Sequence, residues 1–150
     1  MSSDKTIVIA NDHAGLPLKP EILAFLKDKG FTVLDMGTDT YDSVDYPDYA
    51  NLAVSSITSG RASEGILICG SGIGMSIAAN RYEGIRAALC GDVFSAKVAR
   101  LHNDANVLIM GARVIGAGLA LEITQAFFTA AFSQGERHIS RIGKIDSNTK

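Results

Sequence analysis

A glycine-rich segment that begins with a cysteine is the clearest chemical signal in the chain. Cys69 opens the run Cys69-Gly70-Ser71-Gly72-Ile73-Gly74, which follows an apolar stretch and leads into a helical pattern. The N–H groups of such a loop and the positive end of a helix dipole suit an anion or a developing oxyanion. The same surroundings favour a thiolate, so Cys69 is a candidate base. The alternative is a buried, inert cysteine that ends its strand.

A carboxylate and an imidazole follow the first apolar run of the chain. Asp12 and His13 come directly after residues 7–11, at the start of a helical segment. An aspartate at this place is commonly a helix N-cap, which gives Asp12 a structural alternative. If the apolar run is a strand, both side chains lie where it ends.

Basic residues recur near the C-terminus with helical spacing. Arg137, Arg141 and Lys144 stand at i, i+4 and i+7, and such like-charged pairs cost a few tenths of a kcal/mol each. A bound phosphate would offset the repulsion, whereas the alternative is a solvated basic face. His102 and Asn103 close an earlier helical segment, where a histidine is often only a partner for the helix dipole.

The elements that position these residues are predicted from apolar runs and helical periodicity. Strands are predicted at 7–10, 31–34, 65–69, 85–89 and 106–110, and most of these runs are apolar at successive positions, which is typical of parallel strands covered on both faces. Segments with one apolar helical face separate them. We therefore expect an α/β fold, a three-layer Rossmann-like sandwich with a five-stranded parallel sheet, which places ligands at the carboxyl ends of its strands.

Two segments depart from this regular alternation. Pro17 and Pro20 leave the start of the first helix undefined, because only the first turn tolerates a missing N–H. Residues 37–47 have turn composition and exceed a typical loop, so they are predicted to form a wall or lid. No repeat or linker divides the chain. We expect a single domain over residues 1–150, with a C-terminal helix at about 136–145 and a tail to 150.

Composition argues against several classes of partner. The net charge of −2 and the lack of a basic tract argue against nucleic acid, and no apolar run reaches the ~20 residues of a membrane span. The N-terminus has no signal-peptide core, so the cytoplasm is expected. There Cys90 is predicted to be a reduced core residue. The histidines and cysteines show no metal-ligand spacing, and neither metal nor cofactor is expected.

A nucleotide-binding Rossmann module is the alternative from a different functional class. Gly70 and Gly72 fit a dinucleotide fingerprint, and Asp92 lies 20 residues beyond Gly72, near where a ribose-binding acid belongs. However, Met75 stands in place of the third glycine, and the loop follows the third strand instead of the first. The nucleotide-binding alternative is therefore disfavoured.

Seven segments between about Ile7 and Ile142 carry a more specific pattern. They are Asp12-His13, Asp45-Tyr46-Pro47, 65–74, Ala78-Ala79-Asn80-Arg81, Gly84-Ile85-Arg86-Ala87, 102–107 and Gly111-Ala112-Arg113. In order and spacing this series resembles the family of ribose-5-phosphate isomerase B and galactose-6-phosphate isomerase. The resemblance implies a Rossmann-like fold, a homodimer or dimer of dimers with shared active sites, and isomerisation without metal or cofactor through an enediolate.

The resemblance also implies roles for individual residues. Cys69 would remove the C2 proton of the open-chain sugar, and His102 would open the sugar ring. Asp12 and Asn103 would bind sugar hydroxyls. Residues of the loop would stabilise charge on oxygen or bind the substrate (Ser71, Gly70, Gly72, Ile73, Gly74). A second group would hold the phosphate and neighbouring oxygens (His13, Arg113, Arg137, Arg141).

Some positions depart from the family pattern or follow it weakly. Relatives without the cysteine use a glutamate in the glycine-rich loop, but this chain has Met75 there and so resembles the cysteine type. Tyr46 is expected as a pocket wall and His138 as a second ring-opening group.

The expected reaction interconverts ribose 5-phosphate and ribulose 5-phosphate, a step of the pentose phosphate pathway. The alternative within the enzyme class is isomerisation of a hexose 6-phosphate of the allose or galactose type. Galactose enzymes of this family pair unlike subunits, so a single chain with Cys69 favours the pentose.

Overall fold

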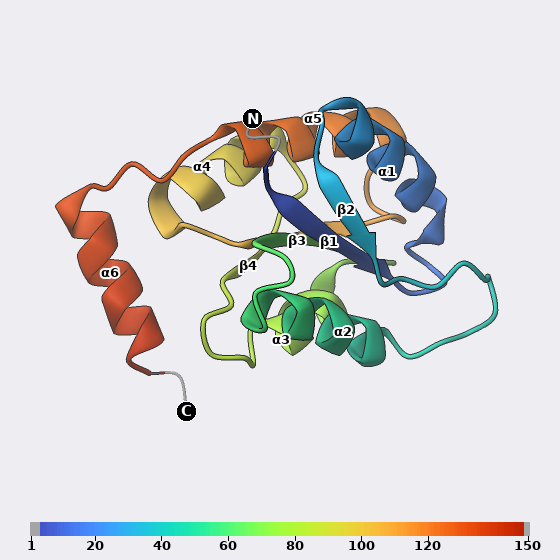
Figure 1. Cartoon of the computed structure of the whole chain (residues 1–150), viewed down its shortest axis with the longest axis horizontal. Helices are drawn as coiled ribbons and strands as arrows, with labels where there is room; N and C mark the ends of the chain where they lie inside the picture. Colours follow the sequence, from blue (N-terminus) through green and yellow to red (C-terminus); the bar gives the residue numbers. More distant parts are fainter. Residues whose placement is uncertain (1–3, 149–150) are drawn as a thin grey trace.

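A five-stranded parallel sheet forms the centre of the computed structural model, which describes residues 4–148 (Figure 1). The strand order is β2-β1-β3-β5-β4. The strands are β1 (Thr6–Asn11), β2 (Thr32–Asp35), β3 (Glu64–Cys69), β4 (Ala87–Leu89) and β5 (Val107–Gly111). The helices are η1 (Leu16–Leu18), α1 (Lys19–Asp28), α2 (Tyr46–Thr58), α3 (Ile73–Ala79), α4 (Val93–Asn103), α5 (Ala117–Thr129) and α6 (Glu136–Asp146). The predicted α/β sandwich is confirmed.

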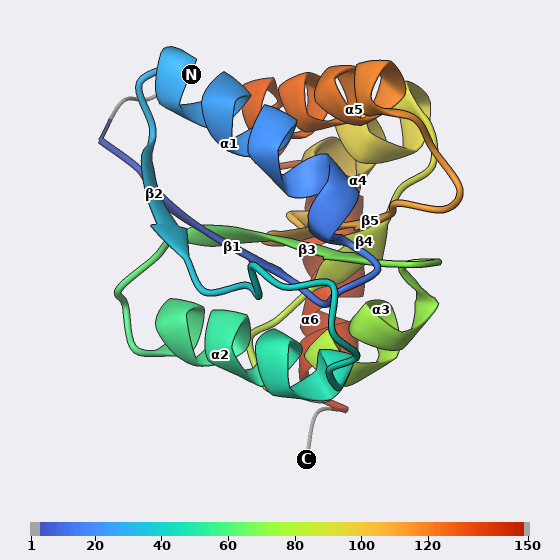
Figure 2. The same ribbon diagram turned by 90° about the vertical axis from the view of Figure 1, so that its right-hand side faces the viewer.

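Helices cover both faces of the sheet, with α1, α4 and α5 on one side and α2 and α3 on the other (Figure 2). Successive residues of β1 therefore enter different cores. Ile7 and Ile9 pack in one cluster, and Val8 and Ala10 in the other, all fully buried. This arrangement explains the unbroken apolar runs, because a strand covered on both faces has no solvent side.

The strand ends differ slightly from the predicted runs. The fourth strand begins at Ala87 instead of Ile85, because the Arg86 N–H bonds to the Asn106 side chain. At the first helix, Pro17 lies in the short 3-10 turn η1, and α1 begins at Lys19 with Pro20 in its first turn. Each proline thus occupies a first turn, where its missing N–H is not needed.

The segment between β2 and α2 has no regular structure and is held by a buried ammonium. The Lys19 side chain is only 3% exposed and pairs with Asp35 and Asp39 at 3.3 and 2.6 Å. Its Nζ also donates to the Thr38 carbonyl at 2.8 Å. A buried ammonium is costly unless it is paired, and here these contacts fix the segment beside the end of β1.

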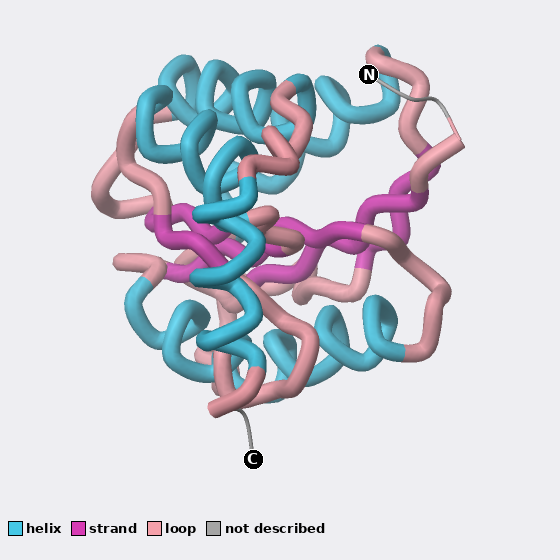
Figure 3. Tube along the Cα trace, turned by 90° about the vertical axis from the view of Figure 1, so that its left-hand side faces the viewer, coloured by secondary structure: helices cyan, strands magenta, loops and turns pink. Residues whose placement is uncertain are grey.

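Helix α6 stands apart from the sandwich and runs across its layers (Figures 1 and 3). Among the helices, its contacts are concentrated on α4. The predicted tail continues to Lys150, but residues 149–150 lie outside the described part of the chain, as do residues 1–3. Within residues 4–148, no helix is long and apolar enough to span a membrane.

Candidate active site

A cleft of about 380 Å³ opens at the carboxyl ends of β1, β3 and β5. Parallel strands that lie side by side bring the residues after their ends together at one edge of the sheet. The cleft is lined by Asp12, His13, Ala14, Tyr46, Cys69, Gly70, Ser71, Gly74, Arg113 and Val114. Seven of these residues were predicted as site residues and Tyr46 as a wall, whereas Ala14 and Val114 were not predicted.

Cys69 ends β3 at the base of the cleft and is 4% exposed. The Gly72 N–H donates a hydrogen bond to its Sγ at 3.2 Å. Gly72 has φ +82°, and a Cβ there would overlap the Leu89 side chain. Glycine is favoured here chiefly by the left-handed backbone, since the Leu89 side chain could move aside. The turn that it permits directs a hydrogen-bond donor at the thiol.

The rest of the glycine-rich loop is packed closely against neighbouring groups. The Ile73 N–H donates to Ser71 Oγ at 3.2 Å, while Ile73 itself is an exposed residue that does not line the cleft. A Cβ on Gly74 would overlap the Tyr46 ring. The ring therefore lies directly on the loop backbone, which confirms the predicted wall at Tyr46.

Asp12 and His13 enter the cleft from the end of β1. Asp12 is 5% exposed, and its Oδ1 accepts the Gly15 N–H at 2.9 Å, which closes a local turn before η1 without capping a longer helix. The Val44 N–H donates to His13 Nδ1 at 3.1 Å. This contact ties the His13 ring to the irregular segment before α2 and so fixes its orientation in the cleft.

Arg113 supplies a cation to the same cleft. Its backbone N–H donates to the Gly70 carbonyl at 2.9 Å. Its side chain passes over the loop, with Cδ and Nη1 at 3.4 and 3.5 Å from where a Cβ on Gly70 would lie. A thiol, backbone donors, an imidazole and a guanidinium therefore share one cleft.

A second group of predicted residues forms a cluster of its own at the ends of α4 and α6. This histidine–arginine cluster comprises His102, Asn103, Arg137, His138 and Arg141. The His102 and His138 rings stack with centroids 4.4 Å apart and planes inclined by 8°. Arg137 Nε donates to His138 Nε2 at 3.4 Å. Burial lowers the pKa of His138, and His102, Arg137 and Arg141 lower it further, so the neutral imidazole is favoured.

The cleft and the cluster lie at opposite edges of the sheet. Arg100 pairs at 2.9 Å with Glu64, the first residue of β3, and His102 follows two positions later in α4. Cys69 is the last residue of the same strand, about 16 Å away at roughly 3.3 Å per residue. A single chain therefore does not bring the predicted base and ring-opening group together.

The region after β4 resembles the cleft in sequence but not in structure. Asp92 caps α4 by accepting the Ser95 N–H at 2.7 Å, so this carboxylate is occupied and gives no support to a ribose site. Cys90 is 2% exposed. Burial, together with the Asp92 charge, raises its pKa from 9.0 to about 11. Cys90 is therefore the inert core cysteine that the sequence predicted.

Two supporting contacts have no recognisable signal in the sequence. The Val44 N–H that fixes His13 belongs to the main chain, so no side-chain pattern reports it. Lys19 has the appearance of an ordinary helical surface lysine, and only its position beside the segment that follows β2 buries it.

The fold and the cleft together define an α/β enzyme for a small polar substrate, with a candidate base beside donors for a developing negative charge. The ribose/galactose isomerase family model matches residues 7–145. The chain therefore belongs to the ribose/galactose isomerase family and is an aldose–ketose isomerase.

Relatives of known name match nearly the whole chain. Ribose-5-phosphate isomerase B of Escherichia coli is 45% identical over 141 residues, 94% of each chain. D-Erythrulose-4-phosphate isomerase of Pectobacterium atrosepticum is 47% identical over 148 residues, 97% of each chain. The crystal structure of a ribose 5-phosphate isomerase from Thermotoga maritima is 52% identical, covers 96% of this chain and 99% of its own, and superposes with a TM-score of 0.92.

Proposed function

We propose that this enzyme interconverts ribose 5-phosphate and ribulose 5-phosphate at an active site built from two copies of the chain. The observation that carries the proposal is the Cys69 thiol, held at 3.2 Å from the Gly72 N–H inside a cleft that also contains Arg113 and His13. The E. coli relative that is named for this reaction adds support.

In the proposed mechanism the Cys69 thiolate takes the proton from C2 of the open-chain aldose. The C2–H electron pair forms the C1–C2 double bond, and the carbonyl pair moves onto O1. Cys69 returns the proton to C1, and the O2 proton moves to O1 as the C2 carbonyl forms. The reaction is therefore an isomerisation that needs no other reactant. The Gly72 N–H lies 3.2 Å from Sγ, so a hydrogen-bond donor is already directed at the sulfur that takes the proton.

The charge that develops on oxygen needs donors already in place. The Gly72 N–H is directed at the thiol, so the amides of Gly70 and Gly74 and the Ser71 hydroxyl are assigned to the substrate oxygens. Removing one such donor costs roughly 3 kcal/mol in known oxyanion holes. Asp12 is assigned to the sugar hydroxyls beside them.

Ring opening and phosphate binding are assigned to the histidine–arginine cluster of a second copy. The cluster lies at the far edge of its own sheet, so it can serve a cleft only on another chain. Apolar side chains beside the cleft favour such a neighbour, since Ile73 is 56% and Val114 67% exposed. A covering copy would remove this surface from water. His102 would then move the ring proton, His138 would assist, and Arg137 and Arg141 would hold the phosphate.

Mixing two inactive variants tests the shared site directly. Cys69→Ala and His102→Asn are each expected to lose activity towards ribose 5-phosphate. After unfolding and refolding together at equal amounts, about a quarter of wild-type activity should return, because half of the dimers are mixed and each then has one intact site. Either variant refolded alone is the control. No recovery, with mixed dimers shown by native mass spectrometry, would rule out sharing.

The length of the sugar is a separate question, and one relative favours a second candidate substrate. The Pectobacterium enzyme is named for a tetrose phosphate and is as similar to this chain as the E. coli enzyme is. Measuring kcat/KM for a panel of sugar phosphates decides among these substrates. The panel contains tetrose phosphates, pentose phosphates, and hexose 6-phosphates of the allose and galactose types. The pentose proposal requires the highest value for ribose 5-phosphate.

The proposed cellular location is the cytoplasm, where cysteine thiols stay reduced. Cys69 and Cys90 are both free and buried. Fractionation of the source cells, followed by assay of each fraction, tests this location.

A further inference from the structure

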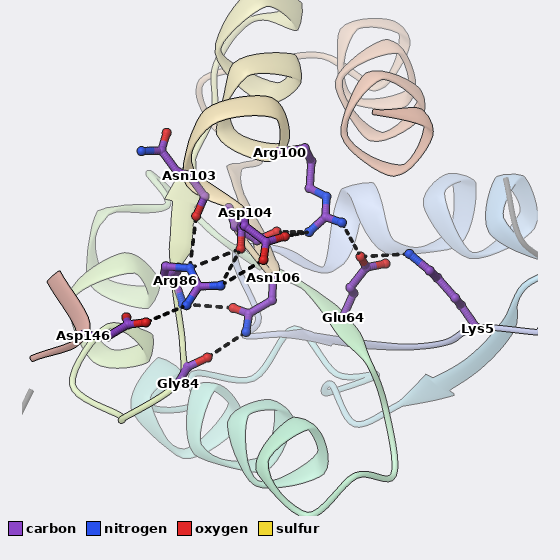
Figure 4. Close-up of polar contacts among 10 residues, drawn as sticks. Lys5, Glu64, Gly84, Arg86, Arg100, Asn103, Asp104, Asn106 and Asp146 are labelled. Atoms are coloured by element: carbon purple, nitrogen blue, oxygen red, sulfur yellow. Dashed lines mark hydrogen bonds and ion pairs between the residues drawn. The ribbon is translucent and has the colours of Figure 1, made fainter. Parts of the chain in front are cut away.

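Charged side chains of alternating sign run along the amino edge of the sheet (Figure 4). Each contacts the next at between 2.9 and 3.5 Å. In order, this charge ladder is Lys5, Glu64, Arg100, Asp104, Arg86 and Asp146. It begins beside β1, passes the end of α4 and reaches α6. The ladder lies outside the cleft, and none of the proposed chemical steps uses it.

Arg86 is the member of the ladder that binds the C-terminal end of α4. Its Nε donates to the carbonyls of Asn103 and Asp104 at 3.0 and 3.2 Å, and Nη2 donates to the Asp104 carbonyl at 3.0 Å. Nη2 also pairs with the Asp104 carboxylate at 3.3 Å. Asp104 has φ +44°, a left-handed conformation that ends the helix. The guanidinium thus binds carbonyl groups that a helix end leaves unsatisfied.

The same guanidinium also reaches α6. Nη1 lies 3.3 Å from the carboxylate of Asp146, the last residue of that helix. A planar guanidinium has five N–H donors in a fixed geometry, so it can join two elements that a lysine could not hold together. Arg86 therefore connects the two helices whose side chains form the histidine–arginine cluster (Figure 4).

The backbone of Arg86 is itself fixed. Its N–H donates to Asn106 Oδ1 at 2.9 Å, and Asn106 Nδ2 donates to the Gly84 carbonyl at 2.8 Å. The Arg86 side chain is 19% exposed, so solvent screens its ion pairs only in part. These contacts give the connection a rigid base at the start of β4.

We propose that Arg86 is a positioning residue that sets the placement of His102 against α6. It contacts no residue of the cleft, and it acts through the end of α4 and through Asp146. Because the cluster is assigned to the active site only under the proposed function, this catalytic consequence rests on that function. The geometric consequence, the stacking of His102 on His138, does not.

Arg86→Met removes every donor but keeps the length of the side chain. We expect kcat/KM for ribose 5-phosphate to fall roughly 10- to 100-fold, since small displacements of catalytic groups have effects of this size. The Cys69 thiol should still react with an alkylating agent, because Arg86 is not among the residues that build the cleft of its own chain. Arg81→Met is the matched control, because Arg81 is an exposed arginine in the same loop between α3 and β4. This variant should keep wild-type activity.

Imidazole titration by NMR gives a readout that does not depend on activity. In the wild type, burial and nearby cations lower the pKa of His138. In Arg86→Met, that pKa should rise towards its ordinary value of 6.5, as α6 moves away from His102 and burial is lost. Arg86→Lys should restore little, because an ammonium does not span both contacts. If Arg86→Met does not fold, Asp146→Ala cuts only the contact to α6 and should give a smaller shift in the same direction.

The possible results separate the two proposals. Lost activity with a shifted His138 titration and an intact Cys69 supports the positioning role. Unchanged kcat/KM and an unchanged titration overturn it, and so does lost activity with an unaltered titration. If the wild type converts no sugar phosphate, the proposed function fails while the titration still reports whether Arg86 places the cluster.

Discussion

The two edges of the sheet carry different chemistry. At the carboxyl edge, Cys69 is buried beside the Gly72 N–H, and the cation that lines the cleft is the Arg113 guanidinium. At the amino edge, two imidazoles stack beside two exposed arginines on α6. The first arrangement suits removal of a carbon-bound proton and the second suits a phosphate and a ring oxygen.

Under the proposed function, this difference means that each edge needs the other to complete an active site. A base needs a protected place with oriented donors, whereas a dianionic phosphate needs several mobile cations in reach of solvent. The chain supplies both, but at opposite ends of β3, a strand about 16 Å long at roughly 3.3 Å per residue. Association of two copies is the simplest way to bring one edge of each chain together.

The largest expected effect is at the carboxyl edge. Cys69→Ala should lower kcat by at least about 10³-fold, because no other thiol is present in the cleft to take the proton. Stopped assays with both sugars measure this loss, and circular dichroism checks the fold. The matched control is Cys90→Ala, which should keep its rate and lose about 1 kcal/mol of stability. Retention of most kcat in Cys69→Ala would assign the proton transfer to another group.

The next effect probes the amino edge and depends on the direction of the reaction. Ribulose 5-phosphate cannot close a furanose ring, because the hydroxyl that would close it carries the phosphate. His102→Asn should therefore lose about 100-fold in initial rate from ribose 5-phosphate and much less from ribulose 5-phosphate. Thermal melting of the same preparation is the control. Equal losses in both directions would leave His102 with a role in orientation or packing.

A smaller effect is expected at the phosphate arginines. Arg141→Ala should weaken inorganic phosphate binding about tenfold, the worth of one charge-assisted hydrogen bond. Calorimetric titration with phosphate measures the affinity. Lys144→Ala, on the same helix, is the control and should bind as the wild type does. Unchanged affinity in Arg141→Ala would make this helix face a solvated basic surface.

Cys90 should also couple folding to pH. The native state holds the Cys90 proton up to about pH 11, whereas the unfolded chain releases it near 9.0. The raised pKa thus contributes stability that is complete below about pH 9 and is lost as pH rises towards 11. Urea unfolding of the wild type and Cys90→Ala should show their free-energy difference falling by about 2 kcal/mol over this range. A constant difference contradicts the raised pKa.

The smallest expected effect is that of metal removal. Among residues 4–148, no three histidine, cysteine, aspartate or glutamate side chains gather in a metal-binding arrangement. Activity should therefore survive dialysis against EDTA without change. Loss of activity with EDTA, followed by recovery with a divalent ion, would replace the proposed thiolate mechanism with a metal-assisted one.

Much of the cleft was predictable because local patterns and topology agree. The apolar run before Cys69 indicates a strand, the glycines that follow require a turn, and parallel strands align their carboxyl ends. Asp12 and Arg113 follow β1 and β5, and Cys69 ends β3, so their meeting is a consequence of the strand order. Local patterns do not determine the contact of Tyr46 with Gly74, because it depends on the course of a long irregular segment.

The sequence by itself determined the alternation of strands and helices, the glycine-rich turn at Cys69 and the helical spacing of Arg137 and Arg141. These are local properties, set by side-chain periodicity and backbone freedom. Only the tertiary structure decided that His102 lies at the opposite edge from Cys69, that Lys19 is buried, and that Arg86 joins the ends of α4 and α6. Such contacts depend on how distant elements pack. A pattern of neighbouring residues does not predict which distant charges this packing brings together.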